Sequence, residues 1–280
     1  MWRLAFSSDS TRVATAGNDG SARVVNSSLH LRILGPLRLS RDGVELDPGP
    51  RQQAYLLALL LARGGRPTSA SELIELIWDD GAPASATNVL QKYVGALRRV
   101  FEPTVLPREA GSYLHRHGNG YRLTTTRGML DLITFREHIE TARTRPDANT
   151  AVDHYTAALG LWHGPAGHGL TYGSAAMPLF TALNGEFLDA CQAAAELAIS
   201  LRQPHRVLPA LRLASSMAPL HEPVQASLVA TLAAAGQRAE ALAVFCAIRT
   251  RLAEDLGIEP GHALRAAHQR VLRQTAVPVP

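Results

Sequence analysis

One stretch of the sequence carries polar side chains at the spacing of a single helix face. Within residues 85–102, positions i, i+4, i+7 and i+11 of this face are Asn88, Lys92, Gly95 and Arg99, flanked by Gln91 and Arg98, and all of them except the glycine are polar. Asn and Gln amides pair with the edge of adenine, whereas Arg and Lys pair with guanine or with phosphate. The glycine leaves room for the backbone to approach base edges. This face therefore has the donors that a helix needs in the major groove of double-stranded DNA.

Apolar side chains occupy the opposite face of the same segment. They have the same spacing and predict an amphipathic helix with one buried face: Leu90, Val94, Leu97 and Phe101. Residues 86–122 carry six basic residues and two acidic ones, in a chain whose net charge is only +4. This local excess favours a polyanion as the partner of the site. A solvated surface helix is the alternative, and the arginine-rich composition by itself is typical of a GC-rich genome.

A β-hairpin with a basic tip is predicted after this helix. Residues 105–123 hold two short alternating runs around a loop of Gly, His and Arg. We expect Arg116 to contact phosphate or the minor groove, whereas Tyr121 either contacts DNA or packs within its strand. His115 and His117 have the spacing of metal ligands, but no third ligand lies at a standard spacing. We therefore predict no metal site and no cofactor.

Shorter elements before residue 85 must position the polar helix. Residues 30–47 alternate apolar and polar and predict a small meander of strands, and helices are predicted at 51–65 and 71–80. Strands, three helices and a hairpin in this order form a helix-turn-helix with a wing. Two more arginines are candidate phosphate contacts or else plain surface residues: Arg51 at the start of the first helix and Arg66 in the loop after it.

The chain changes character after residue 131. Ala and Leu dominate at helical spacing, and Pro and Gly breaks divide the segment into about seven helices. We expect the Gly185 that follows Asn184 to kink one of them. Gln203 and Gln237 lie in similar segments 34 residues apart, which is the period of tetratricopeptide repeats.

These patterns together predict a mainly α protein with a small β component. It comprises a winged helix-turn-helix domain at 30–125 and an all-α, tetratricopeptide-like helical domain at 131–275, followed by a tail at 276–280. Residues 1–29 form an N-terminal extension that resembles a single WD-repeat blade, with Val25-Asn26 in place of the Trp-Asp pair. Because several blades are needed to close a propeller, we expect this extension either to add at most one or two strands against the 30–47 sheet or to be mobile.

Two longer segments resemble one known family. The first segment begins with LRILGPLRL, ends with GNGYRL and includes the helices between them. It resembles the OmpR-type winged-helix DNA-binding domain, in the version found in the Streptomyces antibiotic regulatory protein family. LWHGPA at 161–166 and the helices of 232–274 resemble the bacterial transcriptional activation domain of that family. The resemblance covers about residues 30 to 275.

The resemblance implies a sequence-specific transcriptional activator of a secondary-metabolite (antibiotic) gene cluster. Such proteins bind direct repeats near promoters, often as two copies side by side, and recruit RNA polymerase holoenzyme. The DNA contacts carried over are Asn88, Gln91, Lys92, Arg98, Arg99, Arg116 and Tyr121. Gly95 and Ala96 stand where OmpR-type helices often carry larger polar residues, so base preference does not carry over.

Other functional classes find less support in the sequence. The eleven histidines are scattered and form no nucleophile–base or metal pattern, so we do not expect an enzyme. A helical-repeat adaptor that does not bind DNA is the main alternative. Cys191 and Cys246 lack disulfide or metal spacing and are predicted to be small core residues. With no apolar run of membrane-spanning length and no signal-peptide pattern, we expect a cytoplasmic, nucleoid-associated protein without a membrane partner.

Overall fold

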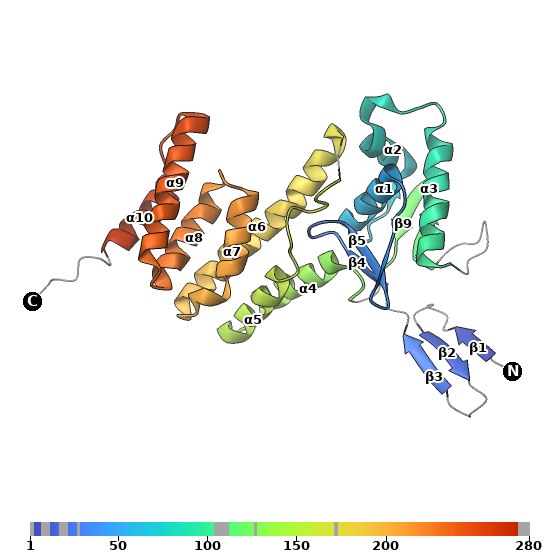
Figure 1. Ribbon diagram of the computed structural model, residues 1–280, viewed down its shortest axis with the longest axis horizontal. Helices are drawn as coiled ribbons and strands as arrows, with labels where there is room; N and C mark the ends of the chain where they lie inside the picture. Colours follow the sequence, from blue (N-terminus) through green and yellow to red (C-terminus); the bar gives the residue numbers. More distant parts are fainter. Residues whose placement is uncertain are drawn as a thin grey trace, which may run out of the picture. The chain divides into compact units, whose positions relative to one another are not determined.

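A computed structural model describes residues 29–103, 112–125, 128–170 and 173–273, together with three strands near the N-terminus. The chain divides into two compact units. The first comprises Met1–Thr134 and Ala166–Thr181, and the second comprises Phe135–Pro165 and Ala182–Pro280. Helices dominate and the sheets are small, so the predicted fold class, a winged helix-turn-helix followed by a helical domain, is confirmed (Figure 1).

The N-terminal extension contains three strands rather than one or two. β1 (Arg3–Phe6), β2 (Arg12–Ala16) and β3 (Ala22–Asn26) pair antiparallel in the order β1-β2-β3. These strands form a sheet of their own, separate from the sheet that follows. The expectation of at most one or two strands was therefore wrong, because the segment forms three strands that pair with one another along the chain.

The remaining sheets and helices of the first unit follow the predicted order. A meander of β4 (Leu29–Arg32), β5 (Arg38–Arg41) and β6 (Val44–Leu46) precedes α1 (Arg51–Ala62). Every residue of α1 from Gln53 to Ala62 is buried. A helix that is buried on all sides lies at the centre of a core, and α2 and α3 both pack against α1 (Figure 1).

The helix-turn-helix consists of α2 (Ala70–Trp78), a 3₁₀ turn η1 (Asp79–Gly81) and α3 (Ala86–Phe101). Ser69 caps α2, because its hydroxyl accepts a hydrogen bond from the Glu72 backbone N–H at 3.1 Å. Ser85 stands at the N-cap position of α3, but its side chain makes no capping hydrogen bond. The orientation of α3 must therefore be fixed by contacts further along the helix.

The wing is a three-stranded sheet rather than a simple hairpin. β8 (Leu114–His117) and β9 (Gly120–Leu123) pair antiparallel, and β7 (Thr68–Ser69) adds to the other edge of β9. A Cβ atom on Gly120 would lie 2.0 Å from the Thr68 carbonyl oxygen, so only glycine allows this pairing. Sequence pattern could not predict β7, because two residues are too few for an alternating run.

The first strand of the meander and the residue after it also bond two segments from far along the chain. The Leu31 N–H donates to the Met129 carbonyl at 2.7 Å, and the Gly167 N–H donates to the Ile33 carbonyl at 2.9 Å. Residues 166–181 consequently belong to the first unit, although the sequence places the domain boundary between residues 125 and 131.

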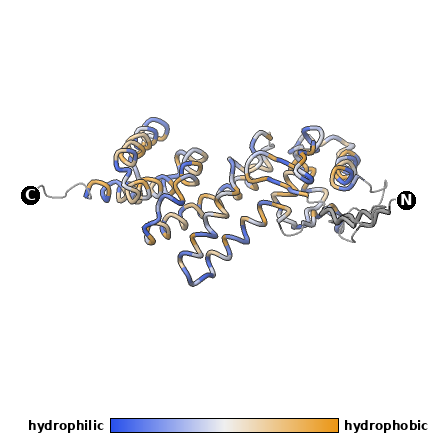
Figure 2. The backbone as a smooth tube through the Cα atoms, turned by 60° about the horizontal axis from the view of Figure 1, so that its bottom comes forward, coloured by the Kyte–Doolittle hydropathy of each residue, from blue (hydrophilic) through white to orange (hydrophobic). Residues whose placement is uncertain are grey.

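The helices after residue 130 number seven in the described part of the chain, as predicted. They are α4 (Asp131–Thr144), α5 (Ala148–Leu159), α6 (Met177–Ser200), α7 (Leu208–Met217), α8 (Glu222–Ala234), α9 (Arg238–Leu256) and α10 (His262–Arg273), with short 3₁₀ turns η2 (Ser174–Ala176) and η3 (Pro204–Arg206). Hydrophilic and hydrophobic residues alternate along them, as in helices that bury one face (Figure 2). α6 continues through Asn184 and Gly185 without a break, and the kink expected there stays a prediction.

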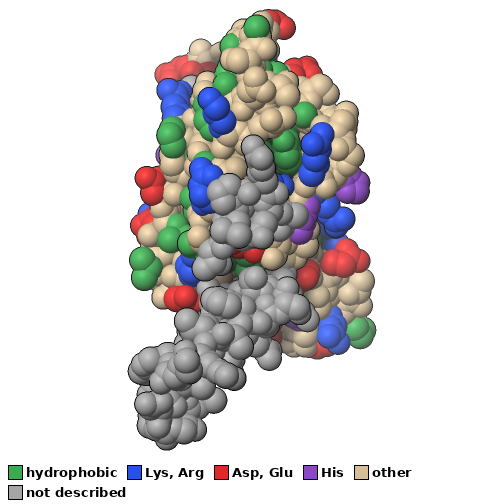
Figure 3. Space-filling view, turned by 90° about the vertical axis from the view of Figure 1, so that its right-hand side faces the viewer, with side chains coloured by type: hydrophobic (Ala, Val, Ile, Leu, Met, Phe, Trp, Pro, Cys, Tyr) green, Lys and Arg blue, Asp and Glu red, His purple; other side chains and the backbone are tan. Residues whose placement is uncertain are grey.

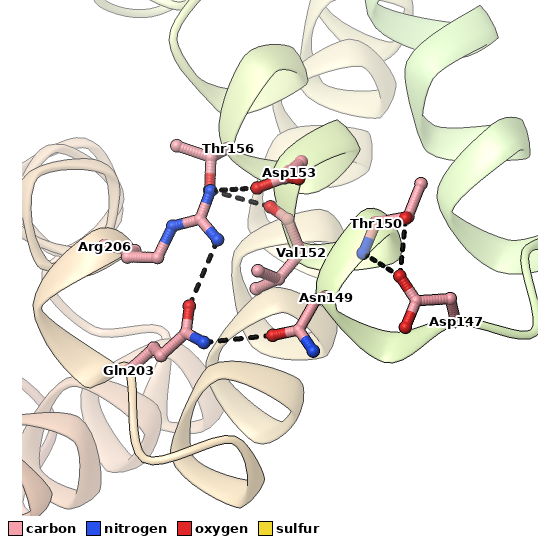
Figure 4. A network of polar contacts seen from close by, with 8 residues as sticks. All are labelled: Asp147, Asn149, Thr150, Val152, Asp153, Thr156, Gln203 and Arg206. Atoms are coloured by element: carbon pink, nitrogen blue, oxygen red, sulfur yellow. Dashed lines mark hydrogen bonds and ion pairs between the residues drawn. The ribbon is translucent and has the colours of Figure 1, made fainter.

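The 34-residue repeat has a structural counterpart in two helix turns. Gln203 and Gln237 each stand at the N-cap position of the next helical segment, without a capping hydrogen bond from the side chain. Each donates its backbone N–H to the carbonyl five residues earlier, Ala198 at 2.8 Å and Leu232 at 2.9 Å. Gln203 also links helices, because its side chain bonds both Asn149 and Arg206 (Figure 4). These contacts tie the turn after α6 to α5.

Aromatic stacking and one cysteine contribute to the core of the second unit. Trp162 stacks on Phe187 at 4.6 Å between ring centroids and meets Phe135 edge-on at 5.6 Å. Cys191 is buried, and burial raises the pKa of its thiol. Cys246 is exposed on α9, so its predicted place in the core was wrong: the helical spacing of its apolar neighbours does not put it on their face.

Candidate nucleic-acid interface

The two faces of α3 are the starting point of the site. The apolar stripe is buried as predicted: Leu90, Val94, Leu97 and Phe101. Four predicted contact residues are exposed on the helix, namely Asn88, Gln91, Lys92 and Arg99. Gly95 is half-buried, yet a Cβ atom added to it would meet no atom within 4 Å. The backbone at Gly95 is therefore open to a large partner.

Three contacts hold α3 in place, and the sequence revealed none of them. The Arg41 guanidinium in β5 donates to the carbonyls of Val100, at 3.0 Å, and of Phe101, which places a cation on the C-terminal end of the helix. The Tyr93 hydroxyl donates to the Gln52 side chain at 2.7 Å. These bonds fix both the axial position of α3 and its rotation.

Arg98 makes the third contact. Its Nε donates to the Leu114 carbonyl at 2.8 Å, and the side chain is half-buried. The bond joins α3 to the first wing strand. Arg98 therefore supports the wing in the DNA-free protein, and a base contact by its remaining guanidinium nitrogens stays a prediction.

In the wing, two of the predicted contact residues lie directly opposite each other. Arg116 and Tyr121 are paired across β8 and β9, so their side chains share one face of the sheet. Arg116 is exposed and Tyr121 is half-buried. Tyr121 also faces Thr68 of β7, which is buried. This arrangement is compatible with both roles left open for Tyr121.

Arg51 and Arg66 are both exposed, at two different places around α3. Arg51 begins α1 and is next to Gln52, the residue that bonds Tyr93 of α3. Arg66 follows Gly65, whose carbonyl accepts a 2.9 Å hydrogen bond from Arg122 of the wing. One arginine is thus close in sequence to a contact with the helix, and the other is close to a contact with the wing.

Positive charge at the site is only partly neutralised within the protein. Arg63 pairs with Glu72, and burial, assisted by the charge of Arg66, lowers the pKa of Arg63. Within the described residues, neither Lys92 nor Arg99 has a hydrogen bond or ion pair. Figure 3 shows Lys and Arg side chains spread over the face of the molecule at the right-hand side of Figure 1. Lys92 and Arg99 can therefore neutralise phosphates without first breaking a contact within the described residues.

Two other features are absent from the described segments. They contain no group of three or more His, Cys, Asp or Glu side chains that could hold a metal ion. None of their helices is both long enough and apolar enough to cross a membrane.

Two family models match the chain in succession. Residues 47–123 match the transcriptional regulatory protein, C-terminal family, and residues 130–272 match the bacterial transcriptional activator domain. The first match ends with the wing, and the second begins at the residue before α4. Together they cover both the winged helix and the helical array.

Several named regulators are similar to the chain. Regulatory protein AfsR of Streptomyces coelicolor is 32% identical over 89% of the chain, and transcriptional regulatory protein EmbR of Mycobacterium tuberculosis is 31% identical over 91%. Regulatory protein DnrI of Streptomyces peucetius is 26% identical over 88%. The chain spans 24% of the AfsR sequence, 66% of EmbR and 92% of DnrI.

A solved structure is also similar. EmbR of Mycobacterium tuberculosis in complex with a low-affinity phosphopeptide superposes with a TM-score of 0.69 at 28% identity, over 90% of this chain and 67% of that one. The similarity therefore extends across the winged helix and the helical array.

Proposed function

Because the chain belongs to the Streptomyces antibiotic regulatory protein family, in which an OmpR-type winged helix precedes a bacterial transcriptional activator domain, we propose that it is a sequence-specific DNA-binding transcriptional activator. Its α3 enters the major groove, and its wing contacts the adjacent backbone or minor groove. Its helical domain contacts the transcription machinery.

The exposed stripe on α3 is the observation that carries this proposal. Lys92 and Arg99 are exposed and unpaired within the described residues, and Gly95 between them leaves the backbone open. An amphipathic helix whose outer face combines amides, cations and a glycine suits direct readout of base edges. A pure adaptor would have no use for this combination.

The finer assignment follows from the family and extends the same proposal. We propose that the protein binds direct repeats near promoters, as two copies on one DNA, and recruits RNA polymerase holoenzyme to a secondary-metabolite gene cluster. Similarity to AfsR and DnrI, both named as regulatory proteins of Streptomyces species, supports it.

In vitro selection of DNA tests the function even though the operator sequence is not known. The full chain is incubated with a pool of duplexes that share fixed ends around a randomised centre, and bound duplexes are amplified and sequenced over successive rounds. We expect enrichment of a motif that occurs twice in the same orientation; the most enriched duplex is here named the selected duplex. Recovery of unenriched sequences would favour the non-DNA-binding adaptor instead.

Gly95→Ala separates the contribution of this residue to DNA binding from its contribution to stability. Alanine favours the helix by up to about 1 kcal/mol over glycine, and the added methyl meets only open space. We expect the variant to unfold at a higher urea concentration yet to bind the selected duplex about ten-fold more weakly, since the methyl group blocks close approach of the bases. Fluorescence anisotropy and urea titration measure the two effects. Unchanged affinity would mean that α3 does not approach DNA at Gly95.

A further inference from the structure

The turn that joins α2 to α3 is bound to a segment from much later in the chain. This segment, here called the strap, comprises Gly173 and η2 (Ser174–Ala176). The carboxylate of Asp79 accepts hydrogen bonds from the backbone N–H of Ala175 at 2.8 Å and of Ser174 at 2.9 Å, and from the Ser174 hydroxyl at 3.3 Å. One side chain of the helix-turn-helix thus satisfies the first backbone donors of η2.

Gly173 and Tyr55 shape the same contact from two other directions. A Cβ atom on Gly173 would lie 2.2 Å from a carboxylate oxygen of Asp79, so a larger residue there would displace this carboxylate. The buried Tyr55 hydroxyl donates to the Leu76 carbonyl at 3.0 Å and forms a hydrogen bond with the backbone of Gly173. Burial raises the pKa of Tyr55 to about 12. The strap is therefore attached to both α1 and the end of α2.

The backbone of Asp79 is itself in an unusual conformation. Its φ is +48° and its ψ is −134°, a region that residues with a side chain rarely adopt. Such a conformation persists only where the surroundings fix it, and it is concentrated at functional sites. Hydrogen bonds from Ala175 and Ser174 lower the pKa of Asp79, so the carboxylate is charged at neutral pH. The bonds to the strap offset the strained conformation.

The strap and the turn lead to two different functional parts. Seven residues after Asp79 the chain enters α3, and directly after η2 it enters α6 at Met177. Only residues 82–85 separate η1 from α3, so the carboxylate and the start of α3 lie close together along the chain. We propose that Asp79 is a positioning residue that couples DNA binding by α3 to the conformation of the strap and the first turn of α6. This inference rests on the proposed DNA-binding function of α3.

Coupling of this kind is reciprocal. If DNA holds the turn in the conformation that binds the strap, then the bound strap raises the affinity for DNA by the same factor. The helical domain is thereby given a signal that the winged helix is on DNA. Asp80, the next residue, has the same charge, is exposed and makes no hydrogen bond within the described residues, which provides a matched control.

The test measures DNA affinity and local protection separately. Full-length wild type, Asp79→Ala, Asp79→Asn and Asp80→Ala are compared by anisotropy with the selected duplex and by hydrogen exchange over residues 173–180, with and without that duplex. In the wild type we expect DNA to slow exchange in this segment. In Asp79→Ala we expect exchange about ten-fold faster without DNA, no response to DNA, and weaker DNA binding. Asp80→Ala should match the wild type.

Asp79→Asn separates the proposed role from a merely structural one. Its amide oxygen still accepts hydrogen bonds, and Asn tolerates a positive φ. We therefore expect DNA to slow hydrogen exchange in this variant nearly as much as in the wild type, unlike in Asp79→Ala. If DNA slows hydrogen exchange over residues 173–180 equally in the wild type and in Asp79→Ala, the proposed coupling is wrong, although the proposed function stands. If the wild type shows no sequence-dependent binding at all, the proposed function fails and the coupling fails with it. Anisotropy distinguishes the two failures, and circular dichroism establishes that each variant is folded.

Discussion

Replacing Lys92 and Arg99 together by alanine is expected to weaken binding to the selected duplex by roughly 100-fold or more, because each lost phosphate or base contact costs about 1–3 kcal/mol. Both side chains are exposed and have no partner within the described residues. Their removal takes away no internal hydrogen bond, and alanine favours a helix. Stability to urea should therefore stay the same while affinity falls.

The salt dependence of binding identifies which kind of contact was lost. The logarithm of the binding constant falls with the logarithm of salt concentration in proportion to the number of neutralised phosphates. If Lys92 and Arg99 bind phosphates, the slope becomes shallower by about two for the double variant, whereas base contacts leave it nearly unchanged. Arg249→Ala with Arg251→Ala, two exposed arginines of α9, makes the same change in charge elsewhere. Equal loss in both double variants would mean that net charge, rather than the α3 face, determines binding.

Arg98 shows why residue type alone could not resolve this site. From the sequence, Arg98 and Arg99 are adjacent cations on one helix and equally good candidates. In the structure Arg99 is exposed, whereas Arg98 bonds the Leu114 carbonyl and supports the wing. An Arg98→Ala variant would consequently mix lost recognition with a displaced wing. The difference depends on a contact between residues 16 apart in sequence, which helical periodicity does not report.

The local spacing of apolar residues predicted the helices and the hairpin of the winged helix, but it did not predict the pairing of strands that lie far apart in the sequence. The i, i+4 spacing of Leu90 and Val94 was enough to orient α3, because a strong apolar stripe must be buried. The pairing of β7 with β9 depends instead on Gly120, which lacks a side chain and so allows Thr68 to approach. No feature of a single isolated glycine distinguishes this role from that of an ordinary turn.

The carboxylates that hold the first unit together were the least predictable part. Asp79 and Asp131 both accept several backbone hydrogen bonds, from the strap and from the end of β4 respectively. In the sequence each is a common helix-end residue. Their partners lie more than 90 residues away, at Ser174 and Ile33. Only the folded chain reveals that these two aspartates join distant segments.

Asp131 is buried at the start of α4 and should make the stability of the first unit depend on pH. Its carboxylate accepts hydrogen bonds from the backbone N–H of Ile33, Leu34 and Leu132 at 2.8–3.0 Å. Burial raises its pKa to about 6 in spite of these bonds and of the charge of Arg32, which favour the ionised form. The folded protein therefore binds a proton at Asp131 more tightly than the unfolded chain does.

The sign of the effect follows from that difference. Where the folded-state pKa is the higher one, the contribution to stability is complete below the unfolded value of 3.8 and is lost as the pH rises through about 6. The difference between the two pKa values corresponds to about 3 kcal/mol. Asp131→Asn cannot titrate, so the free energy of unfolding of the wild type relative to this variant should fall by up to about 3 kcal/mol between pH 4 and pH 7. Urea titrations at a series of pH values measure it.

Asp147→Asn provides a control of opposite sign. Asp147 caps α5, and hydrogen bonds from the hydroxyl and backbone N–H of Thr150 lower its pKa (Figure 4). The wild type should therefore gain stability relative to Asp147→Asn as the pH rises through the acid range, whereas it loses stability relative to Asp131→Asn. Because all other carboxylates titrate identically in the wild type and in each variant, they cancel in both comparisons. A pH-independent difference in the free energy of unfolding between the wild type and Asp131→Asn would mean that the folded protein does not raise the pKa of this carboxylate, so that burial does not outweigh its hydrogen bonds.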